Sequence, residues 1–128
     1  MIRAVCAVVV AVLVWFAVAT IGNVALRLLI PGYAEVERAM SFTLPMQIGR
    51  LALGVVSSVC AGVVCAAIAR SKGLPVKLAA ICMVLLFLPV HYSLWAKFPI
   101  WYHAFFLITL APAVLLGAAL WLRSAGVS

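Results

Sequence analysis

Two histidines, His91 and His103, have types and spacing that suit them for chemistry. Each lies six residues from Lys97. In a helical hairpin with Lys97 at its tip, the two imidazoles would therefore sit at about equal depth. Such a pair could bind a b-type haem, or zinc if one or two further ligands joined it. We expect instead that each ring donates to a backbone carbonyl or a lipid headgroup, and we predict no cofactor, with haem as the alternative.

Aromatic residues surround both histidines. Tyr92 and Trp95 follow the first histidine, and Trp101 and Tyr102 precede the second. Tryptophan and tyrosine are enriched where a membrane protein meets the water interface. We therefore expect these four side chains to form an interfacial aromatic belt.

Two arginines within apolar segments form a second candidate group. An arginine inside a membrane span is costly unless it is paired or reaches the interface. The nearest acids are Glu35 and Glu37, in the connection between the segments that carry Arg27 and Arg50. We predict an ionic cluster of both arginines with one or both glutamates, and with Asn23 on the same helix face as Arg27. This cluster either fixes the first hairpin or binds an anion or lipid headgroup through the planar guanidinium fork.

A ridge of small residues continues from Arg50 along one helix face. Its members recur every fourth residue: Gly54, Ser58, Gly62 and Ala66. Residues four apart share a face, and small side chains let two membrane helices approach closely. Ala113 and Gly117 repeat the pattern over a shorter stretch. The ridge predicts helix packing, either within the chain or with a protein partner or second copy.

Four cysteines lie within apolar segments, at positions 6, 60, 65 and 82. None forms a C-x-x-C pair, and the spacing of Cys60 and Cys65 does not suit a zinc site. We therefore expect the cysteines to be buried small hydrophobic residues.

Composition sets the surroundings in which these groups must be positioned. Of 128 residues, 70% are hydrophobic and 9% are charged, and the mean hydropathy is +1.37. Soluble domains are about half apolar and a quarter charged. Spans of about 4–30, 44–69, 75–95 and 99–122 are long enough to cross a bilayer as helices, and too long for barrel strands. The sequence predicts one all-α domain over 1–128, an integral membrane four-helix bundle.

The first apolar run has a second interpretation as a signal peptide. Arg3 would supply its charged region, and Ala17-Val18-Ala19 would supply a cleavage site. However, the apolar run continues past that site to Ile30, so we expect a retained span.

Basic residues predict the orientation of the chain. The termini and the turn at 70–77 would share one side with Arg3, Arg70, Lys72, Lys77 and Arg123, and the opposite connections carry Arg38 and Lys97. Five basic residues against two favour both termini in the cytoplasm of a multi-pass protein of the bacterial inner membrane. The net charge of +7 is scattered rather than arranged in a stripe, which argues against nucleic acid as a partner and for membrane lipids.

Three short stretches carry a resemblance to a known family. "FTLPM", "LPVHYSLW" and "FPIWYH" resemble an uncharacterised family of small bacterial inner-membrane proteins, over most of the chain. This resemblance implies four helices and no particular activity. The chain departs from small multidrug exporters, which need an acid inside the first span, and from membrane disulfide oxidoreductases, whose cysteine pairs face outward.

Three functions fit this sequence. We expect a non-enzymatic membrane subunit or helix-packing partner, because no nucleophile–base pair and no phosphate-binding glycine loop are recognisable. The first alternative is a protein that binds or transports an anionic lipid or amphiphile at the arginines. The second alternative is a haem-associated or redox subunit that uses the histidines.

Overall fold

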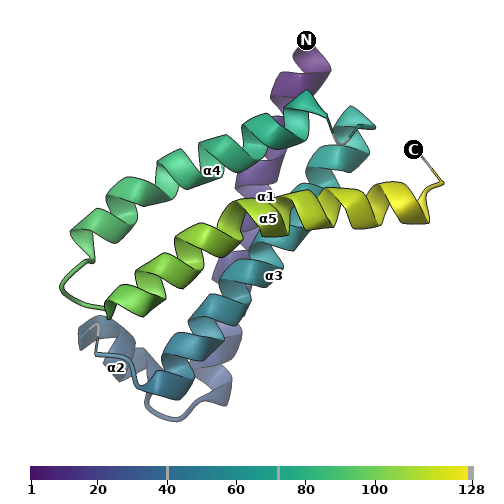
Figure 1. Cartoon of the computed structure of the whole chain (residues 1–128). Coiled ribbons are helices and arrows are strands. Elements are labelled where there is room, and N and C mark those ends of the chain that lie inside the picture. Colours follow the sequence, from purple (N-terminus) through teal and green to yellow (C-terminus); the bar gives the residue numbers. More distant parts are fainter. Residues whose placement is uncertain (40, 72, 127–128) are drawn as a thin grey trace.

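The structure, a computed structural model, describes residues 1–39, 41–71 and 73–126. Within these ranges it contains five helices and no strand (Figure 1): α1 (Ile2–Leu29), α2 (Tyr33–Ala39), α3 (Leu44–Ala69), α4 (Leu74–Ser93) and α5 (Ile100–Ser124). The all-α class is therefore confirmed. Helices α1, α3, α4 and α5 are long and apolar enough to cross a membrane. Their ends lie within two residues of the expected spans.

Large apolar side chains cover the outside of the four long helices. Ile21, Leu28 and Ile108 are each more than two-thirds exposed, and many similar residues share this condition. A large exposed apolar surface is unfavourable in water but favourable against lipid tails. The four helices therefore fit a multi-pass membrane protein in contact with lipid.

Helix α3 lies at the centre and packs mainly against α1 and α5. It runs antiparallel to α1, where the indole Nε1 of Trp15 donates to Ser58 Oγ at 3.0 Å. It runs parallel to α5, because residue numbers rise together in both helices along the contacts, three of which have an offset of 52 residues. That offset joins Arg50 to Tyr102, Gly54 to Phe106 and Gly62 to Val114.

Two glycines bring the backbones of α3 and α5 together. A Cβ atom built on Gly62 would collide with the backbone oxygen of Val114, and one built on Gly117 would collide with that of Val59. Only glycine permits so close an approach. We refer to Val59, Gly62, Val114 and Gly117 as the glycine crossing.

The contacts along the ridge change in kind as α3 and α5 continue away from the glycine crossing. Eight residues before Gly62, the space beside Gly54 is filled by the ring of Phe106 instead of backbone. One turn further, the long side chains of Arg50 and Tyr102 connect the two helices by a hydrogen bond. The helices therefore diverge toward the end that carries Arg50.

The termini lie away from α2, at the end of the helices that includes the connection between α3 and α4 (Figure 1). Here α3 ends at Arg70, which adopts the left-handed conformation with φ of 54°. Lys72, which counts in the predicted charge balance, lies outside the described residues. At the other end, Thr43 precedes α3, with Pro45 in the first turn.

Helix α2 lies where the sequence predicted only a connection between the first two spans. Pro31 and Gly32, the latter with φ of 79°, interrupt the chain after α1. Seven residues are too few for a helix that is stable by itself. The fully buried side chain of Tyr33 and the ion pair of Glu37 fix α2 against its neighbours instead.

Candidate functional site

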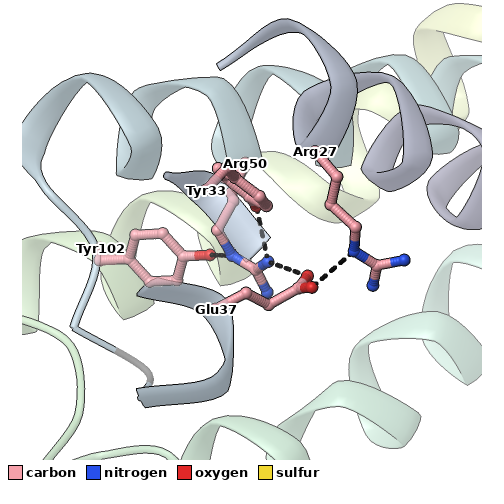
Figure 2. A network of polar contacts seen from close by, with 5 residues as sticks. All are labelled: Arg27, Tyr33, Glu37, Arg50 and Tyr102. Atoms are coloured by element: carbon pink, nitrogen blue, oxygen red, sulfur yellow. Dashed lines mark hydrogen bonds and ion pairs between the residues drawn. The ribbon is translucent and has the colours of Figure 1, made fainter. Parts of the chain in front are cut away.

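Four helices contribute to one polar network where α3 and α5 diverge (Figure 2). We refer to its members as the arginine cluster: Arg27 of α1, Tyr33 and Glu37 of α2, Arg50 of α3 and Tyr102 of α5. The Nε atom of Arg27 lies 2.6 Å from Oε1 of Glu37, and Nη1 of Arg50 lies 3.9 Å from Oε2 of the same carboxylate. Glu37 therefore joins Arg27 and Arg50, the two arginines of the predicted ionic cluster.

The charges of this cluster do not balance. Two guanidinium groups share the single carboxylate of Glu37, while Glu35, the other candidate acid, is exposed to the surroundings. The side chains of Arg50 and Glu37 are only 22% and 21% exposed. Coulomb interactions strengthen as the dielectric constant falls, so the remaining positive charge favours an anion nearby.

Neutral groups hold Arg50 in place without cancelling its charge. Its Nε donates to the hydroxyl of Tyr102 at 3.3 Å, and its Nη1 donates to the hydroxyl of Tyr33 at 3.1 Å. The ring of Phe42 lies 4.6 Å from its Cζ, in cation–π contact. A guanidinium has five N–H donors. Among the described residues, no group accepts from Nη2 of Arg50.

A cavity of about 250 Å³ lies beside Arg50, between α1, α3, α4 and α5. Its polar lining consists of Thr20, Asn23, Arg50, His91 and Tyr102, and its aromatic lining consists of Trp15, Phe16, Phe87 and Phe106. The lining residues Phe16 and Thr20 on α1 and Val90 on α4 are exposed. The cavity therefore opens between α1 and α4. Cavities that combine an apolar wall with a few polar groups are typical of ligand sites.

Asn23 reaches this cavity as an unsatisfied polar group. Its Oδ1 atom is buried, and it has no hydrogen-bond partner within residues 1–39, 41–71 and 73–126. Leaving a buried polar atom without a partner costs about 1–3 kcal/mol. The prediction placed Asn23 with Arg27, whereas the structure places its side chain in the cavity wall with Arg50.

The two histidines turn inward and contact each other. Their Nδ1 atoms are 2.6 Å apart, and the rings are 5% and 1% exposed. The expectation that each imidazole donates to a backbone carbonyl or a headgroup is therefore wrong. The ring of Trp95 stacks on His103 at 4.8 Å between centroids, and His91 lines the cavity.

Geometry argues against haem between these histidines. A haem iron would need both imidazoles on opposite sides of a porphyrin, but the ring centroids are only 4.9 Å apart and the Nδ1 atoms touch. A zinc site would need further ligands, and in the described part of the chain no three His, Cys, Asp or Glu residues come together around a metal position.

The ridge serves packing within the chain. Gly54, Ser58, Gly62 and Ala66 are all buried. Gly54 and Gly62 face α5, and Ser58 accepts from Trp15 of α1. The ridge therefore has no free surface for the protein partner or second copy that was predicted as an alternative. The reason is that Gly117, predicted separately, completes the same interface from α5.

Two further expectations need correction. Only Cys65 is buried among the cysteines, whereas Cys6 and Cys82 are exposed on the apolar outside. Tyr102 does not belong to the aromatic belt, because it is buried and binds Arg50. The other three members, at positions 92, 95 and 101, are exposed at the hairpin of α4 and α5.

Sequence reasoning missed Tyr33 and the role of Tyr102. A signal for Tyr33 was present, because it precedes Glu37 by four residues and would share its face on a helix. No comparable signal paired Tyr102 with Arg50, since the offset of 52 residues depends on how α3 packs against α5.

Comparisons with known proteins place no established family on this chain. No family model matches it, and no curated protein or solved structure is similar to it.

Proposed function

We propose that this chain is a non-enzymatic four-helix bundle of the bacterial inner membrane that binds an anionic amphiphile in the cavity beside Arg50. One observation carries the proposal. A guanidinium that shares its only carboxylate with a second arginine lines a partly apolar cavity. The surplus positive charge suits an anionic head, and the aromatic wall suits an apolar tail.

The opening between α1 and α4 supports entry from the lipid. Its rim includes Phe16 and Val90, which would face acyl chains in a membrane. An amphiphile already dissolved in the bilayer would need no passage through water. Binding alone and binding as one step of transport would both use this site.

The charge distribution supports the orientation with both termini in the cytoplasm. Arg3, Arg70, Lys77 and Arg123 lie at the terminal end of the helices, whereas Arg38 and Lys97 lie at the other end. The positive-inside rule assigns the richer end to the cytoplasm. The arginine cluster would then face the outer leaflet. Attaching alkaline phosphatase after Ser128 tests this orientation, because that enzyme is active only outside the cytoplasm and should remain inactive here.

An experiment on bound amphiphiles tests the function. The full chain would be purified in mild detergent, and its bound amphiphiles would be identified by native mass spectrometry. Arg50→Gln should lose an anionic amphiphile that the wild type retains. Arg38→Gln is the matched control, since Arg38 is exposed on α2, and it should retain the amphiphile. The same anionic species at the same occupancy in Arg50→Gln would refute the proposal.

A further inference from the structure

Resting on the proposed function, we infer that the bound group is the carboxylate of a single-chain amphiphile, held jointly by Arg50 and by Nε2–H of His91. The role of His91 is not visible in the sequence, because it depends on the contact between His91 and His103.

One proton must lie between the two histidines. Two nitrogen lone pairs facing each other at 2.6 Å would repel, so one Nδ1 carries hydrogen and donates to the other. In the neutral pair, the ring that accepts at Nδ1 must carry its own hydrogen at Nε2. The pair therefore exists in two arrangements, which differ in the Nε2 atom that is protonated.

The surroundings of His103 select between these arrangements. Its Nε2 is buried and has no partner in the described residues. A buried N–H without an acceptor is rarer than an under-satisfied acceptor. His103 therefore donates from Nδ1 and leaves its Nε2 as the unprotonated atom. His91 accepts at Nδ1 and carries hydrogen at Nε2.

This arrangement makes His91 a hydrogen-bond donor in the cavity wall. Its Nδ1 is occupied by His103, so Nε2–H is the polar group that the ring can offer to a ligand. Arg50 lines the same cavity, and the N–H groups of its Nη2 also remain to donate. A carboxylate has two oxygens that accept from two such donors. His103 acts as a positioning residue, since it sets the proton position of His91.

The charge and size of the site favour a carboxylate over a phosphate. The arginine cluster leaves one positive charge unbalanced, which matches a carboxylate of charge −1. A terminal phosphate carries about −1.5 to −2 near neutral pH and would leave negative charge unpaired. A volume of about 250 Å³ lies below the roughly 300–1,000 Å³ of drug-sized ligand pockets. It holds the head and first carbons of one chain, and the rest of the tail leaves between α1 and α4.

Binding of three twelve-carbon probes tests this inference. The full chain would be reconstituted in phosphatidylcholine nanodiscs, and binding of dodecanoate, dodecyl phosphate and dodecanol would be measured by equilibrium dialysis against empty nanodiscs. We expect saturable binding of dodecanoate and affinities at least about tenfold lower for the other two probes. Dodecanol lacks the charge that strengthens the hydrogen bonds, and dodecyl phosphate would carry negative charge that the site leaves unpaired. Tighter binding of dodecyl phosphate would overturn the carboxylate assignment and leave anion binding intact.

Variants separate the two claims. Arg50→Gln should abolish dodecanoate binding, and His91→Phe should weaken it about tenfold. Tyr92→Phe, at an adjacent position that is 85% exposed, should leave it unchanged. Unchanged binding in His91→Phe would overturn the role of His91 but not the proposed function. Saturable binding of none of the three probes would overturn both.

Nitrogen-15 NMR of histidine-labelled wild-type protein gives a readout that does not depend on a folded variant. We expect His91 to be protonated at Nε2 and His103 at Nδ1. His103→Phe should remove this preference and shift the His91 signals toward a mixture of both tautomers. The opposite assignment in the wild type would overturn the inference, whatever the variants do.

Discussion

The glycine crossing and the arginine cluster lie on the same two helices but join them in opposite ways. At the crossing, the absence of side chains on Gly62 and Gly117 brings the backbones into contact. At the cluster, the long side chains of Arg50 and Tyr102 bridge a wider separation. The first arrangement fills space with backbone, and the second leaves room for a cavity.

This difference shows how a small membrane protein can combine a firm core with a binding site. Close packing is a main source of stability between helices in lipid, where the hydrophobic effect contributes little. Polar groups at such depth are costly and are typically functional. We therefore expect the crossing to contribute most to the stability of the fold, and we propose that the cluster serves binding. The following predictions test this division.

The largest effect is expected for Gly62→Ala. The new Cβ would collide with the backbone oxygen of Val114, so α3 and α5 would have to separate. We expect a loss of about 3 kcal/mol in the free energy of unfolding, as for severe overpacking. Unfolding by sodium dodecyl sulfate in mixed micelles, followed by circular dichroism, measures it. Gly49→Ala is the control, because its Cβ would meet only Leu26 Cδ2 at 3.5 Å. Equal effects of both changes would contradict the division.

A smaller effect is expected for Glu37→Gln. Replacing the Glu37 carboxylate by an amide leaves Arg27 and Arg50 without their shared negative charge. Breaking a fully buried pair costs about 3–5 kcal/mol, but Arg27 is 46% exposed, so we expect about 1–2 kcal/mol. The same unfolding titration applies. Glu35→Gln removes an equal charge from an exposed position and should change stability by less than about 0.5 kcal/mol. A loss as large for Glu35→Gln would indicate a general charge effect.

The smallest effect is expected for Tyr33→Phe. It removes one hydrogen bond from the hydroxyl to Arg50 and retains the buried ring. Such a loss costs about 1 kcal/mol. Thermal unfolding in detergent should detect it, with Tyr92→Phe as the exposed control. If Tyr33→Phe is neutral, α2 is fixed by the ring of Tyr33 and by the ion pair of Glu37.

Much of the fold followed from local patterns. Apolar runs longer than a bilayer span predicted the helices, because a backbone in lipid must satisfy its own hydrogen bonds. The small residues at every fourth position of the ridge predicted that Gly62 would pack closely against another helix. The helix α2 was missed, because a short polar segment is stabilised by contacts such as that of Tyr33 and not by its own composition.

Less of the candidate site could be predicted. The pairing of Arg27 with an acid of the next connection was expected, because the connection keeps the groups near one another. The inward direction of His91 and His103 was not, since depth alone does not fix the rotation of two helices. The sequence likewise left open whether a partner or another helix of the chain covers the ridge, and the structure shows that α5 covers it.

The sequence by itself determined the long helices, their order and the position of each polar residue along them, because these depend on the length and spacing of the apolar runs. Only the tertiary structure decided which side chains meet. The contacts of Arg50 with Tyr102 and of His91 with His103 require helix rotations and a register that many packed side chains set together. The cavity beside Arg50 depends on the same packing, because it forms where α3 and α5 diverge from their glycine crossing.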